Sequence, residues 1–141
     1  MKYEKSCGAV VFTRVNGEIR YALIEQHGRV FGFPKGHVEG NETEKETALR
    51  EIHEEVRLAP RFIEGFRETE EYILPGEEEI CKTVVYFLAE YAGQEIVIQP
   101  EELAGAPVVS YEEAMELLQF DGKKRILKAA NDFLLNAKTD F

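Results

Sequence analysis

The sequence contains no tryptophan, and it has only two cysteines and five prolines in 141 residues. Cys7 lies in an apolar run and Cys81 precedes an expected strand, so the two cysteines indicate no disulfide framework. Reduced thiols and a cytoplasmic location are expected. An apolar run long enough to cross a membrane is also lacking, and the start MKYEKSCGAVVF does not have the pattern of a signal peptide. Membrane association is therefore not expected.

Basic residues are scarce as well, because 17 Lys and Arg stand against 27 Asp and Glu, which gives a net charge of −10 at pH 7. A protein that binds polymeric nucleic acid needs a basic surface, so this kind of partner is not expected. The charge does not exclude a small phosphate-bearing substrate, since metal ions can bridge an acidic site to an anion. The length suits a single domain spanning residues 1–141, and a monomer or weak dimer is expected.

The most informative stretch is residues 36–58, GHVEGNETEKETALREIHEEVRL, where a glycine-containing turn leads into an expected helix. Thr43 is a favourable N-cap, and Glu46 three residues later completes a capping box. Apolar residues that recur every three or four positions lie on one side of a helix, and this rule predicts the buried side. Its members are Leu49, Ile52 and Val56, with Ala48 at the edge.

Glu51, Glu54 and Glu55 project from the opposite side at spacings that let their carboxylates approach one another. Like charges at these spacings destabilise a helix, so a neutralising partner is expected. One interpretation is a solvated acidic face that Arg50 and Arg57 partly neutralise. The other is a divalent cation, and Mg²⁺ suits a site made of a few carboxylates and substrate phosphates. The cluster contains no Cys or His, so a structural zinc is not expected.

The order of the residues favours the metal. Residues 36–58 closely resemble the Nudix signature, G-x5-E-x7-R-E-U-x-E-E-x-G-U with U aliphatic, at every defined position except the second glycine, where Arg57 stands. That glycine normally ends the helix in a left-handed turn, so Arg57 predicts either a longer helix or a weaker cap. Stability and loop shape should be affected more than chemistry. The matching positions are Gly36, Glu42, Arg50, Glu51, Ile52, Glu54, Glu55 and Leu58.

Outside this stretch the pattern is that of a layered α/β chain. Alternating side chains predict strands, Asn16-Gly17 predicts a tight hairpin turn, and an apolar stripe over residues 123–137 predicts the last helix. In residues 82–91, even-numbered and odd-numbered side chains should face opposite sides of the sheet. Strands are expected at residues 7–15, 19–26, 62–72, 82–91, 95–99 and 108–109, a loop at 27–32, and helices at 43–58, 112–118 and 123–137.

The resemblance extends over nearly the whole chain to one branch of this superfamily, the asymmetric diadenosine tetraphosphate hydrolases. It includes residues 6–12, 33–39, 64–66, 82–90 and 112–120. It implies a Nudix fold, which is an α/β fold with a mixed β-sheet sandwiched between α-helices. It also implies Mg²⁺-dependent hydrolysis of dinucleoside polyphosphates by water attack on a phosphate, with Mn²⁺ as a possible substitute ion. Diadenosine tetraphosphate would yield ATP and AMP.

The same resemblance implies roles for individual residues. Arg50 would orient a glutamate, Glu42 would brace the loop against the helix, and one of the metal-site acids would activate water. A further acid is expected from the loop before the last two helices, where Glu102 fits best by spacing and Glu101 stays an alternative. His37 is equally explained as a hydrogen bonder of its turn. The metal site would comprise Glu51, Glu54, Glu55, Glu102 and Gly36. Lys82 would contact phosphate, and Tyr72 would stack on a nucleobase. Lys35 and His37 flank Gly36 at the start of the acidic helix, and this position favours contact with phosphate.

One departure concerns the nucleobase. Members of that branch usually carry a Tyr and a Trp where Ala106 and Val108 stand, so a base sandwiched between two rings would lose one of them. Stacking on a ring is worth about 1–3 kcal/mol per base, so the adenine preference stays open. The alternative is another Nudix pyrophosphohydrolase, acting on nucleoside triphosphates, RNA 5′-ends or nucleotide sugars. A non-catalytic nucleotide-binding module is disfavoured because Glu51, Glu54 and Glu55 are all present.

Overall fold

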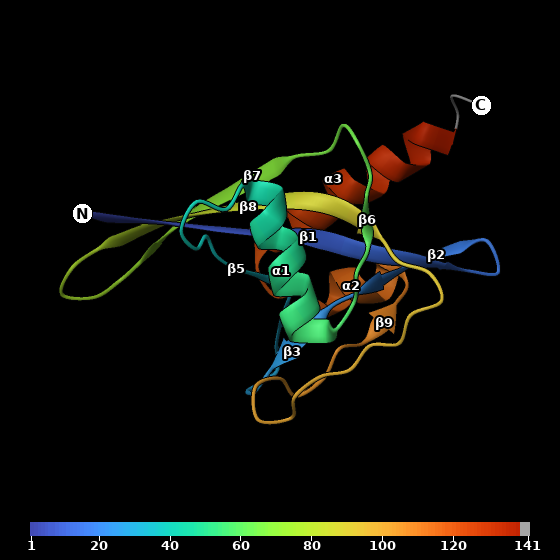
Figure 1. The fold of residues 1–141 in the computed structure, drawn as a ribbon, viewed down its shortest axis with the longest axis horizontal. Coiled ribbons are helices and arrows are strands. Elements are labelled where there is room, and N and C mark those ends of the chain that lie inside the picture. The colour runs from blue at the N-terminus through green and yellow to red at the C-terminus, as the bar shows by residue number, and fades with distance from the viewer. Residues whose placement is uncertain (139–141) are drawn as a thin grey trace.

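The computed structural model describes residues 1–138, and its centre is a mixed β-sheet (Figure 1). β1 (Lys2–Val15) and β8 (Ile80–Glu90) lie side by side and run parallel, from Lys2 opposite Ile80 to Phe12 opposite Glu90. Within residues 1–138, the five other strands of this sheet pair antiparallel, and two further strands form a separate small sheet. The five are β2 (Glu18–Ala22) and β5 (Lys35–His37) on β1, β6 (Arg61–Phe62) and β7 (Glu68–Leu74) on β8, and β9 (Val108–Val109) on β2; the two are β3 (Ile24–Gln26) and β4 (Val30–Gly32).

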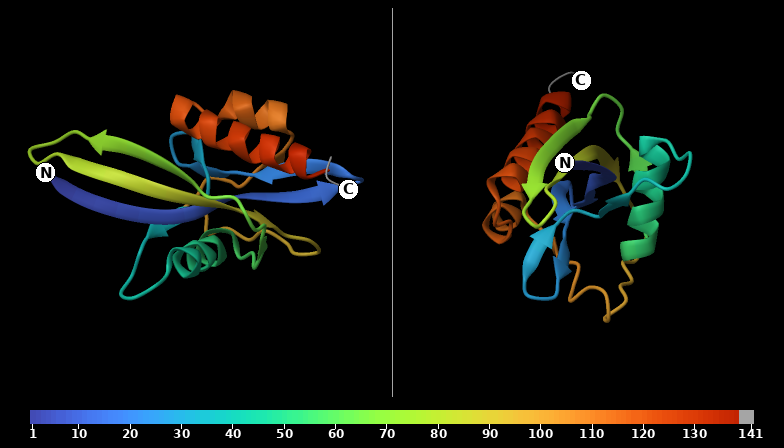
Figure 2. Two further views of the ribbon diagram at one scale, coloured as in Figure 1. Left: turned by 90° about the horizontal axis from the view of Figure 1, so that it is seen from above. Right: turned by 90° about the vertical axis from the view of Figure 1, so that its left-hand side faces the viewer.

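Helices cover both faces of the main sheet (Figure 2). α1 (Glu44–Val56) packs on one face, while α2 (Tyr111–Leu117) and α3 (Asp121–Lys138) pack on the other. This arrangement confirms the predicted α/β fold with a mixed sheet between helices. Each helix begins and ends within about two residues of its predicted bounds, as expected for terminal turns. None of the helices in residues 1–138 combines the length and the hydropathy needed to cross a membrane.

Alternation along β8 divides the buried core into two clusters, one on each face of the sheet. Even-numbered side chains of β8 pack with α2 and α3, and odd-numbered ones pack with α1, as their spacing predicted. The hairpin at Asn16-Gly17 is also confirmed, because both residues have positive φ, at 52° and 81°. The β8 side chains are Val84, Tyr86 and Leu88 in the first cluster and Val85, Phe87 and Ala89 in the second.

The predicted buried side of α1 is wrong at one position. Ala48, Ile52 and Val56 are buried, but Leu49 is 39% exposed and Thr47 is buried in its place. Ala48, Ile52 and Val56 are spaced four residues apart and form one line along the helix, from which Leu49 is rotated by about 100°. Thr47 is tolerated inside because its hydroxyl donates a hydrogen bond to Glu42.

Several strand predictions are also corrected. Residues 95–99 form no strand, because the amide of Val97 donates to the carbonyl of Val56 at the end of α1 and so does not join the sheet. The expected strand over residues 19–26 is broken into β2 and β3, and that over residues 62–72 into β6 and β7. The expected loop at residues 27–32 contains β4, which pairs with β3. Short β5 was not predicted at all.

Arg57 ends α1 in the left-handed conformation, with φ 61° and ψ 26°, so a longer helix is excluded. Its amide donates to the carbonyl of His53 at 2.9 Å. A left-handed residue other than glycine costs about 1–2 kcal/mol. The next residue, Leu58, is fully buried, and burial of a leucine contributes about 1.5–3 kcal/mol. The turn is therefore retained because it brings Leu58 into the core.

Candidate active site

The start of α1 fixes the position of its acidic residues. Thr43 is the N-cap, its hydroxyl accepts a hydrogen bond from the Glu46 amide at 3.1 Å, and the Glu46 carboxylate accepts one from the Thr43 amide at 2.8 Å. The predicted capping box is thus confirmed. It sets where the helix begins and hence which side chains, one to three turns later, face β5 and the preceding loop.

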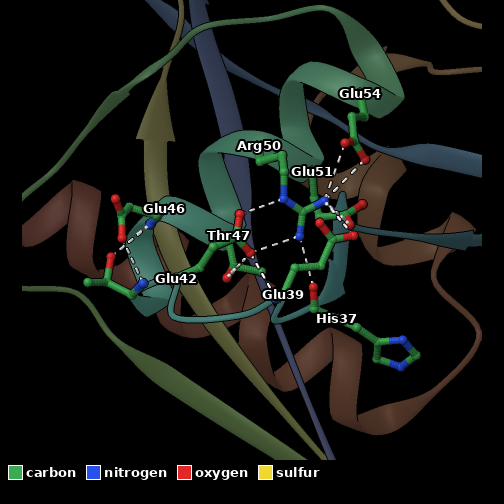
Figure 3. Close-up of polar contacts among 9 residues, drawn as sticks. His37, Glu39, Glu42, Glu46, Thr47, Arg50, Glu51 and Glu54 are labelled. Atoms are coloured by element: carbon green, nitrogen blue, oxygen red, sulfur yellow. Dashed lines mark hydrogen bonds and ion pairs between the residues drawn. The ribbon is translucent and has the colours of Figure 1, made fainter.

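Arg50 is the centre of the polar contacts on this side of α1 (Figure 3). Its Nε donates to Glu42 Oε2 at 2.6 Å and its Nη2 to Glu42 Oε1 at 3.0 Å. Its Nη1 donates to Glu51 at 2.9 Å and to both oxygens of Glu54 at 3.3 Å. Nη2 also reaches the backbone carbonyl of His37 at 2.9 Å. One planar guanidinium therefore orients three carboxylates, which a lysine could not do.

Glu42 holds the loop before α1 against the helix. Besides the two bonds from Arg50, its Oε1 accepts from the amide of Glu39 at 2.9 Å and from the hydroxyl of Thr47 at 3.0 Å. The hydrogen bonds from Arg50, followed by the Glu39 amide, lower the pKa of Glu42 to about 2. Glu42 is consequently ionised at neutral pH, and its contacts agree with the bracing role that the family resemblance implies.

Gly36 of β5 makes room for the carboxylate of Glu51. A Cβ at position 36 would overlap the Glu51 carboxyl group, so any other residue here would displace it. The Glu51 side chain is only 15% exposed, and burial raises its pKa against the opposing effect of Arg50. Glycine is thus required at position 36 for a steric reason, because β5 approaches α1 closely there.

Glu55 lies at the end of this acidic group. Its Oε1 accepts a hydrogen bond from the Lys35 amide at 3.4 Å, while its buried Oε2 has no hydrogen-bond partner among the described residues. Burial, together with the charge of Glu51 and, more weakly, that of Glu102, raises the pKa of Glu55 to about 8. A buried carboxylate oxygen without a donor is unfavourable, so it calls for a proton or a cation.

The acidic residues fit a hard divalent cation by their chemistry, because all their donor atoms are carboxylate oxygens. Within residues 1–138, however, no three acidic, histidine or cysteine side chains already converge on one point. Arg50 lies between Glu51 and Glu54 instead. Glu54 is 54% exposed and could turn away from Arg50 at little cost, and Glu55 Oε2 has no competing donor among the described residues.

A cavity of about 720 Å³ opens beside this group, and Lys35 and Glu55 belong to its wall. It is lined by buried aromatic rings and by charged side chains. Of the predicted substrate contacts, Lys35 and Tyr72 line it, whereas Lys82 and His37 do not. Phe31 and Phe33 also line it while packing in the core. The other charged or aromatic lining residues are Glu70, Glu71, Phe120, Lys123 and Arg125.

Two further lysines surround Lys35. Burial, followed by the ammonium groups of Lys82 and Lys123, lowers the pKa of Lys35 to about 8. Lys82 is directly opposite Tyr72 in the β7–β8 ladder, so the two predicted contacts are neighbours. Lys123 comes from α3 and was not predicted. The fold therefore gathers three positive charges from three separate elements.

Sequence reasoning missed the pair formed by Glu70 and Lys123. Lys123 Nζ lies 3.1 Å from Glu70 Oε1 and 5.6 Å from the centre of the Tyr72 ring. Glu70 is two residues from Tyr72 on the same face of β7, and this spacing was the available signal. Nothing local in the sequence marks Lys123, because its place depends on how α3 packs against β7.

Glu102 lies on the loop that the sequence pointed to. This loop is held to β3 by two hydrogen bonds of 2.8 Å. The amide of Glu25 donates to the carbonyl of Gly105, and the amide of Ala104 donates to the carbonyl of Glu25. His27 adds a hydrogen bond to the carbonyl of Pro100 at 2.9 Å. Glu102 is exposed but near enough to raise the pKa of Glu55. It does not line the cavity.

The structure does not bring the imidazole of His37 to the cavity wall. The ring is exposed, and its Nε2 lies 3.6 Å from Glu4 Oε1 (Figure 3 shows it turned away from Arg50). Only the His37 carbonyl takes part in the acidic group, through Arg50. Ala106 and Val108 are likewise absent from the cavity wall, and Ala106 packs against the α1 side of the core.

Comparison with known proteins defines the class. The chain matches the NUDIX domain family over residues 3–130 and belongs to this family, so it is a Nudix hydrolase. Its fold agrees with solved members: the NUDIX domain of Shewanella oneidensis NrtR complexed with ADP ribose superposes with a TM-score of 0.71 at 18% identity, covering 94% of this chain and 90% of that one.

A particular branch of the family is also defined. The chain is 32% identical to the asymmetrical bis(5′-nucleosyl)-tetraphosphatases of Sus scrofa and Mus musculus, over 92% of this chain and 95% of each of those proteins. The Ap4A hydrolase of C. elegans, in a binary complex, superposes with a TM-score of 0.85 at 24% identity, covering 94% and 98% of the two chains. The predicted resemblance to the asymmetric diadenosine tetraphosphate hydrolases is confirmed.

Proposed function

We propose that this chain hydrolyses dinucleoside polyphosphates, represented by diadenosine tetraphosphate, to ATP and AMP in the presence of Mg²⁺. The observation that carries the proposal is the hydrogen bond from the Lys35 amide to Glu55, where the acidic side of α1 meets a cavity that Lys35 and Lys123 line. A cation on one side and ammonium groups on the other suit a chain of phosphates. The identity of 32% to the asymmetrical tetraphosphatases supports this choice of substrate.

The proposed metal site consists of hard oxygen donors. Glu51, Glu54, Glu55 and Glu102 would hold Mg²⁺, or Mn²⁺ as a substitute, with Gly36 leaving space for Glu51. When bound, such an ion stabilises charge on phosphate oxygens and lowers the pKa of a bound water. The unpartnered oxygen of Glu55 supports this assignment, because a cation would satisfy it.

The side chains of the site have separate tasks in hydrolysis. Lys35 and Lys82 bind the non-bridging oxygens of the phosphate that is attacked and stabilise its growing negative charge. Glu55 accepts the proton of the attacking water while the new P–O bond forms and the anhydride P–O bond breaks. Support for Glu55 comes from its place on the cavity wall, whereas Glu102 is the alternative base. Arg50 touches no substrate and orients Glu51 and Glu54.

A nucleobase would stack on Tyr72, which lines the cavity. One face of its ring carries Lys123, so the base would use the other face. The aromatic pair usual in this branch is missing at Ala106 and Val108, but neither position lines the cavity. Phe120 is 56% exposed at the wall and offers a second ring in its place.

The cysteines and the net charge bear on the cellular setting. Cys7 and Cys81 are both free, which supports a reducing compartment such as the cytoplasm. The charge of −10 supports a small nucleotide rather than a polymeric nucleic acid as substrate. We also propose that residues 1–141 act as one domain, as a monomer or weak dimer.

A substrate panel tests the function. Diadenosine tetraphosphate, ATP, ADP-ribose, a nucleotide sugar and a 5′-triphosphorylated RNA are incubated with Mg²⁺ or Mn²⁺, and the products are separated by chromatography. The expected result is the highest kcat/KM for diadenosine tetraphosphate, with ATP and AMP as products. A higher value for another substrate would favour the second candidate, a Nudix pyrophosphohydrolase of different specificity, which the replacement of both usual aromatics at Ala106 and Val108 supports. Binding without any metal-dependent turnover would contradict both.

A further inference from the structure

Glu70 and Lys123 form an ion pair inside the cavity wall. Their side chains are only 9% and 14% exposed, and Lys123 Nζ lies 3.1 Å from Glu70 Oε1. A buried ion pair adds little net stability, because both groups lose their hydration. The hydroxyl of Tyr86 is also buried and forms no hydrogen bond of good geometry among the described residues, and after burial the charge of Glu70 raises its pKa. Such a costly arrangement points to a use other than stability.

A glycine lets the pair occupy this place, because a Cβ at Gly122 would overlap Oε2 of Glu70. Gly32 lies against the Lys123 side chain, where a Cβ would make an ordinary contact at 3.4 Å with Cε. The Tyr72 ring, 5.6 Å from the ammonium, covers another side. Lys123 is therefore held at one position on the wall, and it does not sweep through solvent as exposed lysines do.

The ammonium groups of Lys35, Lys82 and Lys123 lie close together at one side of the cavity. Lys82 and Lys123 are both close enough to Lys35 to disfavour its charged form, after the larger effect of burial. Glu70 pairs with Lys123, and the charge of Glu55 offsets only part of the repulsion at Lys35. Repulsion among the remaining charges would be relieved by a ligand with several negative charges, which a phosphate chain provides.

We propose that Lys123 is a third cationic contact for the phosphate chain of the substrate, beside Lys35 and Lys82, and that Glu70 is the residue that positions it. The inference rests on the proposed function, because it extends the binding site of the same nucleotide. Glu70 does not touch the substrate. It fixes the direction of the Lys123 ammonium across the Tyr72 ring.

The test measures binding of inorganic tripolyphosphate to the full chain by calorimetry without divalent cations. The double variant Glu70→Leu/Lys123→Met removes one positive and one negative charge, so the net charge of the cavity is kept and only the direct contact is lost. We expect its affinity to fall about tenfold, as for loss of a charge-assisted hydrogen bond. Unchanged affinity in this variant would overturn the proposal.

The matched control is the double variant Lys128→Met/Asp132→Leu. It removes an ion pair from the same helix, where Lys128 Nζ lies 2.7 Å from Asp132, but away from the cavity. Its affinity for tripolyphosphate should equal that of the wild type. An equal loss in both double variants would show a general effect of α3 and contradict the role of Lys123. Thermal unfolding verifies that each variant is folded.

Glu70→Asp tests the positioning role, because it keeps the charge and shortens the side chain by one methylene. Tripolyphosphate affinity should fall although the net charge is unchanged. The same affinity as wild type would show that Glu70 acts only by its charge, and would overturn its positioning role.

Kinetics separate this inference from the proposed function. For diadenosine tetraphosphate, the Glu70→Leu/Lys123→Met variant should raise KM about tenfold and leave kcat nearly unchanged, since the contact exists before and during the reaction. A fall in kcat with an unchanged KM would contradict the assignment of Lys123 to binding. If the wild type binds tripolyphosphate through Lys123 but hydrolyses no member of the panel, the function fails and the inference stands.

Discussion

The site has two walls, an acidic wall and a lysine wall, and the chain builds them in different ways. The acidic wall comes from one short stretch of chain, and its charges are already connected, because Arg50 bonds to three of its carboxylates. The lysine wall comes from β5, β7, β8 and α3, and its like charges disfavour one another. We define the acidic wall as Glu42, Arg50, Glu51, Glu54 and Glu55, and the lysine wall as Lys35, Glu70, Lys82 and Lys123.

This difference explains why the acidic wall could be predicted from the sequence and the lysine wall could not. Helical spacing alone places the acidic side chains together, whatever the rest of the chain does. The lysine wall exists only once β7 pairs with β8 and α3 packs over them. The acidic wall is also preorganised by local contacts. In the lysine wall, by contrast, the repulsion among the ammonium groups would be relieved by a bound anion. Variants of the two walls should therefore fail in different ways.

The largest expected effect belongs to the acidic wall. Glu54→Gln should lower turnover by orders of magnitude, because it removes a carboxylate of the proposed metal site, while the exposed side chain leaves the fold intact. Steady-state kinetics with saturating Mg²⁺ measures this. Glu116→Gln makes the same chemical change on the exposed side of α2 and should be silent. Near-wild-type rates for Glu54→Gln would contradict the metal assignment.

A second prediction concerns the pH dependence of stability without metal. A glutamate in the unfolded chain ionises near pH 4.5, but Glu55 in the fold ionises near pH 8, because burial raises its pKa. Its proton is therefore retained by the folded state alone between these values, and the free energy of unfolding falls as pH rises, by up to about 1.4 kcal/mol per pH unit.

Thermal unfolding of the wild type and Glu55→Gln between pH 5 and pH 8 checks this. The Tm of the variant should fall less over this window than that of the wild type. Adding Mg²⁺ at pH 8 should raise the Tm of the wild type more than that of the variant, since a cation takes the place of the proton. Parallel pH profiles for the two proteins would show that Glu55 ionises normally.

On the lysine wall, the neighbouring ring should affect binding and leave chemistry intact. Tyr72→Leu removes the proposed stacking surface, so KM for diadenosine tetraphosphate should rise about tenfold, within the range of about 1–3 kcal/mol for one stacked base. The value of kcat should change little. Affinity for tripolyphosphate, which has no base, provides the comparison and should fall less than affinity for diadenosine tetraphosphate, because the ring also covers one side of Lys123. An equal loss for both ligands would assign Tyr72 to the phosphate site.

The smallest effect is expected at the end of α1. Arg57→Gly should stabilise the protein by about 1 kcal/mol, because glycine adopts the left-handed conformation without the steric cost that arginine bears. The Tm should rise by a few degrees and turnover should not change. A lower Tm would mean that Arg57 makes a favourable contact that outweighs its backbone conformation.

The contrast between local spacing and tertiary contacts also explains which features of the fold were predicted correctly from the sequence. The capping box of Thr43 and Glu46 and the two-sided burial of β8 follow from local spacing, and both are confirmed. Helical spacing also predicted that the carboxylates of Glu51, Glu54 and Glu55 approach one another, but Arg50 lies between Glu51 and Glu54 instead. Leu49 was wrongly predicted to be buried. The sequence spacing does not show that Thr47 is buried instead, because this depends on the hydrogen bond from its hydroxyl to Glu42. Residues 95–99 look like a strand, but their backbone is engaged by the end of α1.

Tertiary contacts account for what stayed hidden. Lys123 and Glu70 are separated by 52 intervening residues, and neither carries a local signal for pairing with the other. Gly122 has a use only because the Glu70 carboxylate lies against it. The roles of Glu51, Glu54, Glu55, Glu102 and Gly36 in metal binding, and of His37 in substrate binding, stay predictions.

Binding of Mn²⁺, followed by electron paramagnetic resonance without nucleotide, tests the division between the two walls most directly. The wild type and the Glu70→Leu/Lys123→Met variant should bind Mn²⁺ equally well, while Glu54→Gln should bind it at least about tenfold more weakly. Equal binding by Glu54→Gln, or loss of Mn²⁺ from the lysine-wall variant, would contradict the account.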